Sequence, residues 1–236
     1  MLKITDLNKK FGKLQVLNNI NLEFSEPAIN ILIGPNGSGK TTLLKSILGI
    51  THPNSGSIEL DNKKIKNFSD FKRNFSYLPQ IAQFPDNLTG KDLIKMVKDI
   101  RASESMEDKY LEIFNLGKEL KKPIKYLSGG NKQKLNTVLS FMFDAKIYIF
   151  DEPTVGLDPV SVLNFRDLLL ELKTEGKIVI LTTHNLDFVS IIADLVIFLL
   201  DGNIYFKGSY SDLLENEKSN TLMEAIAKVL KDNDID

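Results

Sequence analysis

The feature that most constrains the fold is a short apolar segment, residues 28–33, that runs directly into a glycine-rich turn. The turn reads Gly34-Pro-Asn-Gly-Ser-Gly-Lys40-Thr41, and residues 41–48 after it carry leucine and isoleucine at helical spacing. This order predicts a buried strand, a tight loop and a helix. The loop fits the pattern G-x-x-x-x-G-K-[ST], in which backbone N–H groups form a nest for phosphate oxygens at the start of a helix.

The last two residues of this loop predict a nucleotide site. We expect Lys40 to bridge the β- and γ-phosphates of a nucleoside triphosphate and the Thr41 hydroxyl to bind Mg²⁺. The alternative is a glycine-rich turn that matches by chance, which average residue frequencies allow in roughly 1% of chains of this length. The position of the loop between strand and helix favours the nucleotide interpretation.

Two carboxylates follow the apolar segment 147–150, where a buried strand is expected to end. Asp151 is placed to hold the magnesium shell, and Glu152 is placed to act as a general base on a water that attacks the γ-phosphate. The alternative is a pair of acids that opens a surface loop. The phosphate loop elsewhere in the chain favours the catalytic interpretation.

Two further segments have open interpretations. His184 follows the apolar segment 177–183, so it lies at a strand end where open α/β sheets collect ligand groups, but a structural role is equally compatible with its position. The turn Leu127-Ser-Gly-Gly130 precedes a predicted helix. Its amides and the Ser128 hydroxyl suit a second anion, yet an ordinary helix cap explains them as well.

The arrangement of apolar segments predicts an α/β protein. Residues 2–7 and 16–24 alternate like antiparallel strands, whereas strands at 28–33, 147–150, 178–182 and 195–200 alternate with helices, as in a parallel sheet. Between residues 80 and 143 only helices are expected, at 89–99, 107–114 and 131–143, which indicates an inserted helical subdomain. A hairpin turn at 201–203 and a C-terminal helix at 220–231 complete the pattern.

Composition excludes several classes of function. The chain has 236 residues with 30 Lys and Arg against 31 Asp and Glu, so it lacks the net basic charge typical of nucleic-acid binders. It has no cysteine and only two histidines, which excludes thiol chemistry and disfavours a zinc site built from several histidines. No secretory signal is present and no apolar run reaches the roughly 20 residues of a membrane span, so we expect a cytoplasmic protein.

The combined motifs resemble the nucleotide-binding subunit of an ABC transporter, over about residues 2–208. They are, in chain order, Gly34 to Thr41, Gln80, Leu127-Ser-Gly-Gly130, Asp151-Glu-Pro-Thr-Val-Gly-Leu-Asp158 and His184. The resemblance implies a single domain, 1–236, with a phosphate-loop NTPase core (1–80 and 144–236), an N-terminal antiparallel β subdomain, and an inserted α-helical subdomain (81–143) that carries the Ser-Gly-Gly signature.

The resemblance also implies ATP and Mg²⁺ as ligands, bound at the interface of a head-to-tail dimer. Its ATP-binding residues are Phe11, Val16, Gly34, Pro35, Asn36, Gly37, Ser38, Gly39, Lys40, Thr41, Thr42, Gln80, Ser128, Gly129, Gly130, Asp158 and His184. Its catalytic residues are Glu152, His184, Gln80 and Lys40, and its magnesium residues are Thr41, Gln80 and Asp151.

Individual roles follow from the same resemblance. Phe11 stacks on adenine through its ring face, and Val16 packs the sugar and base. Ser128 and Gly130 of one copy contact the γ-phosphate held by the other copy, and Asp158 communicates across the dimer. The signature continues with Asn131, where glutamine is commoner in the family, which shortens that amide by one methylene.

The expected function is an ATPase that drives transport through separate integral-membrane permease subunits, as a homodimer or as a heterodimer with a second ATPase subunit. The chain would then lie peripherally on the cytoplasmic face of the membrane. A narrower resemblance, over residues 77–90 and 97–101, is to the ATPase subunit of copper-linked transporters that serve maturation of nitrous oxide reductase. The alternative is a soluble ABC ATPase that acts in DNA repair or translation, which the near-neutral charge disfavours.

Overall fold

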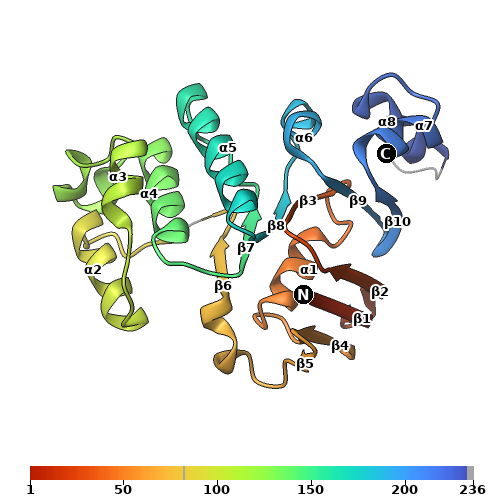
Figure 1. Cartoon of the computed structure of the whole chain (residues 1–236), viewed down its shortest axis with the longest axis horizontal. Coiled ribbons are helices and arrows are strands. Elements are labelled where there is room, and N and C mark those ends of the chain that lie inside the picture. The colour runs from red at the N-terminus through yellow and green to blue at the C-terminus, as the bar shows by residue number, and fades with distance from the viewer. Residues whose placement is uncertain (82, 233–236) are drawn as a thin grey trace.

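Two β-sheets and surrounding helices make up the computed structural model shown in Figure 1, which describes residues 1–81 and 83–232. The strands are β1 (Leu2–Phe11), β2 (Leu14–Phe24), β3 (Ala28–Ile33), β4 (Ser55–Leu60), β5 (Lys63–Lys64), β6 (Phe75–Leu78), β7 (Ile147–Asp151), β8 (Ile178–Thr182), β9 (Leu195–Leu200) and β10 (Asn203–Gly208). The α-helices are α1 (Lys40–Ile47), α2 (Gly90–Arg101), α3 (Glu107–Ile113), α4 (Gly129–Phe141), α5 (Pro159–Thr174), α6 (Leu186–Ile192), α7 (Tyr210–Asn216) and α8 (Leu222–Asp232).

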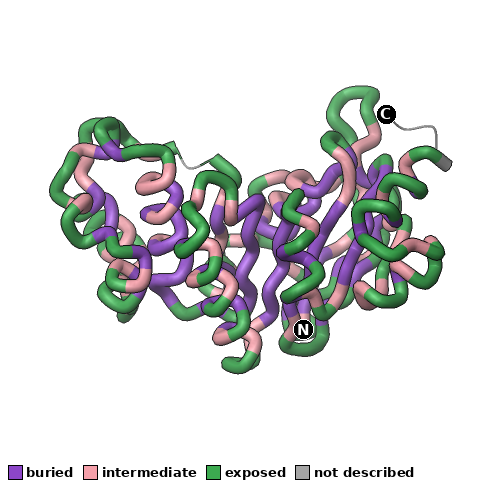
Figure 2. Tube along the Cα trace, turned by 90° about the horizontal axis from the view of Figure 1, so that it is seen from above, coloured by how far each residue is buried: buried purple, intermediate pink, exposed green. Residues whose placement is uncertain are grey.

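The larger sheet positions the rest of the molecule. Its strand order is β10-β9-β3-β8-β7-β6, with β9, β3, β8, β7 and β6 parallel and β10 antiparallel at one edge. Side chains alternate between two buried faces, because successive residues of a strand point to opposite sides. Ile147 and Ile149 of β7 face one core, whereas Tyr148 and Phe150 face the other, and Figure 2 shows this central sheet as a continuous buried layer.

The two faces bury different partners. One face packs against α1 and the smaller antiparallel sheet, whose order is β2-β1-β4-β5. The other face packs against α4, α5 and the C-terminal helices, as the arrangement in Figure 1 shows. Helices on both faces explain why the parallel strands are apolar along their whole length.

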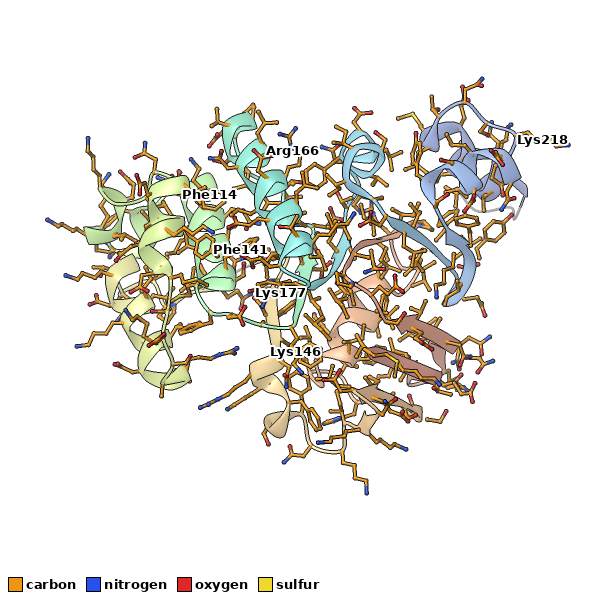
Figure 3. The ribbon with its side chains drawn as sticks, viewed as in Figure 1. Phe114, Phe141, Lys146, Arg166, Lys177 and Lys218 are labelled. Atoms are coloured by element: carbon orange, nitrogen blue, oxygen red, sulfur yellow. The ribbon has the colours of Figure 1, made fainter. Side chains whose placement is uncertain are left out.

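An aromatic cluster joins the helical part, residues 90–141, to the sheet. Phe141 of α4 lies with its ring centroid 5.3 Å from Phe150, 5.4 Å from Tyr110 and 5.7 Å from Phe165. These partners come from a strand and two other helices, so one side chain connects four elements (Figure 3). This packing anchors α4, and with it the turn that precedes α4, to the strand that carries Asp151.

The predicted fold class is confirmed: a mostly parallel sheet flanked by helices, with an antiparallel sheet formed by the N-terminal strands. The helix expected at 131–143 begins two residues earlier, because the Ser128 side chain caps it and the two glycines form its first turn. β1 continues beyond the expected residue 7 to Phe11 because register shifts accommodate its polar second half.

Some elements were absent from the sequence prediction. These elements are strands β4, β5 and β6 and helix α7. β4 pairs with β1 and β6 pairs with β7, both distant in the sequence, whereas β5 has two residues and pairs with the neighbouring β4. The predicted ranges 81–143 and 144–236 include residue 82 and residues 233–236, which lie outside the described residues. Within residues 1–81 and 83–232, every helix is too short or too polar to cross a bilayer.

The aromatic cluster predicts a large stability difference between two phenylalanines. Phe141→Ala should lower the free energy of unfolding by about 3–5 kcal/mol, because it removes a buried ring from a packed site. Phe11→Ala is the matched control, since its ring is 51% exposed and its loss should change stability by less than about 0.5 kcal/mol. Chemical denaturation of the nucleotide-free variants measures both values, and equal losses would contradict the assigned packing.

Candidate functional site

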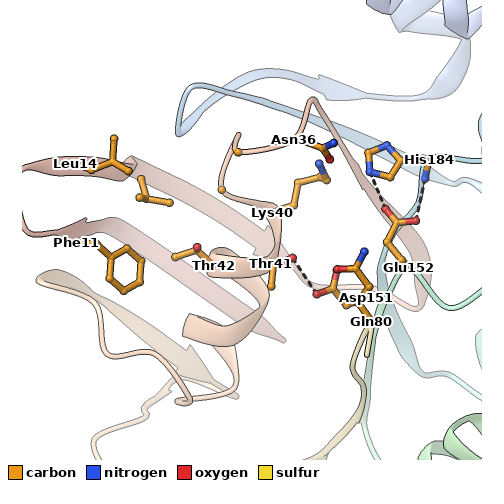
Figure 4. Close-up of a pocket in the computed structure, with 13 residues that line it drawn as sticks. Phe11, Leu14, Asn36, Lys40, Thr41, Thr42, Gln80, Asp151, Glu152 and His184 are labelled. Atoms are coloured by element: carbon orange, nitrogen blue, oxygen red, sulfur yellow. Dashed lines mark hydrogen bonds and ion pairs between the residues drawn. The ribbon is translucent and has the colours of Figure 1, made fainter. Parts of the chain in front are cut away.

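A pocket of about 330 Å³ opens at the carboxyl ends of the central parallel strands (Figure 4). It is lined by Phe11, Leu14, Val16, Asn36, Gly37, Gly39, Lys40, Thr41, Thr42, Gln80, Asp151, Glu152 and His184. Residues from both sheets and from four loops therefore meet at one site. Such a crevice is where open α/β sheets bind ligands.

The glycine-rich loop wraps around the Lys40 side chain. The Lys40 ammonium donates to the carbonyl oxygens of Gly34, at 2.7 Å, and Pro35, at 2.9 Å. Gly34 has a φ of 148°, and a Cβ there would lie 2.1 Å from the carbonyl oxygen of Leu199. Only glycine therefore lets the loop approach β9 this closely.

The electrostatics of Lys40 suit an anionic ligand. Burial lowers its pKa, and the nearby Glu152 and Asp151 carboxylates oppose that shift. The hydroxyl of Ser38, two residues before Lys40, is buried and has no hydrogen-bond partner among the described residues. A buried hydroxyl without a hydrogen-bond partner is costly unless a ligand satisfies it.

Asp151 lies at the end of β7, only 2% exposed, with one hydroxyl on each carboxylate oxygen. The Thr41 hydroxyl donates to Oδ2 at 3.0 Å, and the Thr182 hydroxyl donates to Oδ1 at 2.7 Å. The Thr41 hydroxyl, the Asp151 carboxylate and the Gln80 side chain provide oxygen donors in the same pocket. When Mg²⁺ also contacts phosphates, the protein usually supplies only one or two of its oxygen ligands. These residues therefore fit that ion.

Glu152 is held in an unusual conformation at the base of the pocket. Its φ is 50°, in the left-handed region that non-glycine residues seldom adopt. Its Oε2 accepts from the His184 backbone N–H at 3.1 Å. Oε1 lies 3.3 Å from His184 Nε2 and has no hydrogen-bond partner within residues 1–81 and 83–232. Burial raises the pKa of Glu152, and the His184 and Lys40 groups moderate that rise.

The opposite end of the pocket is apolar. Phe11, Val16 and Leu14 line it, and Figure 4 shows the Phe11 ring and Leu14 at the end away from Glu152. Leu14 is 66% exposed and was absent from the sequence prediction. Leu14 lies two residues before Val16, and alternate residues of a strand share a face. This spacing could have predicted that Leu14 lines the pocket together with Val16.

Four predicted site residues lie outside the pocket of the single chain: Ser128, Gly129, Gly130 and Asp158. The Ser128 hydroxyl accepts from the Asn131 N–H at 3.2 Å and caps α4. Asp158 accepts from the Ser161 N–H at 2.9 Å to cap α5, and it pairs with Lys134 at 2.7 Å, which keeps its pKa well below the usual range. Within one chain these residues act as helix caps.

The remaining predicted residues are close to the pocket without lining it. Gly34 and Pro35 accept from Lys40 through their carbonyl oxygens, and Ser38 is buried within the loop. The structure thus brings together residues from distant parts of the sequence. They are Phe11, Val16, the glycine-rich loop, Gln80, Asp151, Glu152 and His184.

The raised pKa of Glu152 predicts a pH-dependent stability difference. The folded state holds this proton more tightly than the unfolded state, so Glu152 lowers stability as pH rises above its ordinary range, near 4.5. Glu152→Gln removes that titration, so the stability of the variant relative to the original chain should increase between pH 4 and pH 7.

Thermal unfolding of both proteins in EDTA across this pH range measures the effect. A stability difference that stays constant with pH, or shrinks as pH rises, would contradict the raised pKa.

Comparison with known proteins identifies the family of the chain. Residues 17–155, which include the loop and both acids, match the ABC transporter family. The lantibiotic transport ATP-binding protein SrtF of Streptococcus pyogenes is 34% identical over 229 residues, covering 94% of this chain and 98% of that protein.

Solved structures agree. A structure of an ATP-binding subunit of an ABC transporter superposes with a TM-score of 0.89 at 26% identity, covering 97% of this chain and 99% of that one. A dimeric, post-hydrolysis ATP-binding cassette bound to ADP and Pi shares the fold, with a TM-score of 0.79 at 24% identity over 89% of this chain and 98% of the other. The chain belongs to the ABC transporter family and is an ATP-binding subunit, an ATPase, of that family.

Proposed function

We propose that this pocket binds ATP with Mg²⁺ and hydrolyses it to drive transport through separate membrane subunits. One observation carries the proposal: Lys40, Asp151 and Glu152 line a single pocket, and the buried Oε1 of Glu152 has no hydrogen-bond partner among the described residues. A phosphate-binding cation, a metal-binding carboxylate and a base are the three groups that phosphoryl transfer to water requires.

Binding begins with the exchange of hydrogen bonds at the loop. Lys40 gives up the carbonyl oxygens of Gly34 and Pro35 for the β- and γ-phosphate oxygens. The amides of the loop and the free Ser38 hydroxyl satisfy further phosphate oxygens. Phe11 stacks on the adenine ring, while Val16 and Leu14 cover the sugar and base from the same apolar end.

Three residues are proposed to hold the magnesium ion: Thr41, Gln80 and Asp151. When bound, the ion neutralises charge that develops on the phosphate oxygens. The Thr41–Asp151 hydrogen bond of 3.0 Å already brings two of these side chains together. Asp151 is therefore oriented before the metal arrives.

Glu152 is proposed as the general base. Its free Oε1 takes a proton from the attacking water, and the raised pKa makes the carboxylate a stronger base than one in solvent. His184 lies 3.3 Å from that oxygen through Nε2 and is placed to orient the water and contact the γ-phosphate. Its backbone N–H fixes the other oxygen of Glu152.

The quaternary arrangement is also proposed. Ser128, Gly129 and Gly130 contribute to the ATP site of a second copy or a second ATPase subunit in a head-to-tail dimer, and Asp158 acts across that interface. Two facts support this: these residues lie outside their own pocket, and relatives of this fold are seen as dimers. Residues 81–143 act as the inserted subdomain that links the dimer to the permease.

Partners and location follow from this proposal. The chain works with integral-membrane permease subunits and lies on the cytoplasmic face of the membrane through them. The similarity to a lantibiotic transport ATP-binding protein supports a transport role over the soluble DNA-repair or translation alternative. The cargo is selected in the permease, and the copper-linked resemblance stays a prediction.

Removal of the base separates binding from hydrolysis. Glu152→Gln should retain ATP binding and lower turnover by at least about 100-fold, because a general base contributes roughly that much or more. Fluorescent-nucleotide titration and phosphate release measure the two effects. Turnover that equals the original chain would remove Glu152 from its proposed role.

Complementation tests the shared site. Lys40→Ala and Ser128→Arg should each abolish turnover, yet a mixture should recover up to about a quarter of the original activity, because random pairing makes half the dimers mixed and each mixed dimer keeps one intact site. A mixture no more active than the separate variants would show that Ser128 does not complete the site of its partner or that one site cannot work alone. Cross-linked ATP-bound mixed dimers distinguish these two outcomes, since only an intact shared site traps nucleotide.

A further inference from the structure

A single threonine at the end of β8 contacts both acids of the site without touching the pocket. Thr182 is fully buried and lies directly opposite Asp151 in the parallel pairing of β7 with β8. It is absent from the residues that line the pocket. Any effect it has on nucleotide chemistry must therefore pass through its neighbours.

The Thr182 hydroxyl both donates and accepts a hydrogen bond. It donates its single proton to Asp151 Oδ1 at 2.7 Å. Its oxygen accepts from the Glu152 backbone N–H at 3.0 Å, and that N–H also lies 3.2 Å from the Thr182 carbonyl oxygen. One hydroxyl thus links the side chain of the first acid to the backbone of the second.

Each link constrains a group that the reaction uses. With Oδ1 of Asp151 held by Thr182, Oδ2 faces the Thr41 hydroxyl at 3.0 Å, which fixes the plane of the carboxylate toward the phosphate loop. The Glu152 N–H that Thr182 accepts belongs to a residue with a φ of 50°. Such a conformation persists only where the surrounding structure holds it. Loss of the hydroxyl frees Oδ1 of Asp151 and leaves the Glu152 N–H with only the longer contact to the Thr182 carbonyl oxygen, so both acids are held less tightly.

We propose that Thr182 is a positioning residue whose hydroxyl sets the orientation of the Asp151 carboxylate and of the Glu152 backbone, and thereby the metal affinity and the hydrolysis rate of the site. This inference rests on the proposed function of the pocket. Supporting groups behind metal ligands typically change metal affinity or activity by about 10–100-fold when removed.

The test is a graded series at one position. Thr182→Val keeps the shape of the side chain and removes the hydroxyl, Thr182→Ser keeps the hydroxyl and removes the methyl, and Thr182→Cys replaces the hydroxyl with a weaker donor. The chain contains no native cysteine, so the introduced thiol is the only one. Thr137→Val is the matched control, because its equally buried hydroxyl donates to the Gln133 carbonyl oxygen of α4, at 3.0 Å, and not to either acid.

Two readouts separate positioning from a general loss of structure. The first is the affinity for Mn²⁺ in the presence of the non-hydrolysable analogue adenylyl imidodiphosphate, measured by electron paramagnetic resonance. The second is kcat for ATP with Mg²⁺. Nucleotide binding in EDTA reports whether the pocket itself is intact.

Thr182→Val should weaken Mn²⁺ binding and lower kcat, each by about 10–100-fold, with unchanged nucleotide binding in EDTA. Thr182→Ser should match the original chain, and Thr182→Cys should lie between Ser and Val. If Thr182→Val does not fold, the Ser and Cys variants decide the question. The inference is overturned if Val or Cys matches the original chain in both readouts, or if Thr137→Val reproduces the losses.

The result also separates this inference from the proposed function. If the original chain hydrolyses ATP and the series shows no trend, only the role of Thr182 fails. If the original chain binds no nucleotide, both the proposed function and this inference are wrong. If it binds nucleotide without turnover, the Mn²⁺ affinities still decide the role of Thr182.

Discussion

The parallel pairing of β7 with β8 is the constraint on which the rest of the structure depends. Its register sets Asp151 opposite Thr182, and the chain leaves both strands at the same edge of the sheet. Glu152 directly follows Asp151 and His184 lies two residues beyond Thr182, so the carboxylate of Glu152 accepts from the His184 backbone N–H at 3.1 Å. A shift of one residue would turn Asp151 toward the opposite face and separate these groups.

The two buried cores make this register the only stable one. Each central strand is covered on both sides, so its side chains must alternate correctly between two different sets of partners. That rigid scaffold holds features that cost free energy: a left-handed Glu152, an unpaired Ser38 hydroxyl and a buried Lys40. Such strain collects where function needs preorganised groups, and every one of these residues lies in or beside the pocket.

Ser128 and Asp158 have one role in the single chain and a second, proposed role in a dimer. Ser128 and Asp158 begin α4 and α5 as side-chain caps, and the same turns expose the residues proposed to complete a neighbouring ATP site. The sequence left the cap and the anion site as alternatives for the Leu127-Ser-Gly-Gly130 turn. The single chain shows the cap, which is compatible with an added role once a partner is present.

Local patterns in the sequence determined the parallel strands β3, β7, β8 and β9, most helices, the phosphate loop and the acids at the end of β7, because each depends on apolar periodicity or on a short motif. Leu14 had a local signal in its spacing from Val16, whereas the positions of β4 to β6 and the contacts of Thr182 depend on the tertiary structure. β6 has only four residues and gains its partner, β7, from a segment about 70 positions away. Long-range pairing brings Thr182 to Asp151, 31 positions distant, so only the tertiary structure could decide which hydroxyl orients both acids.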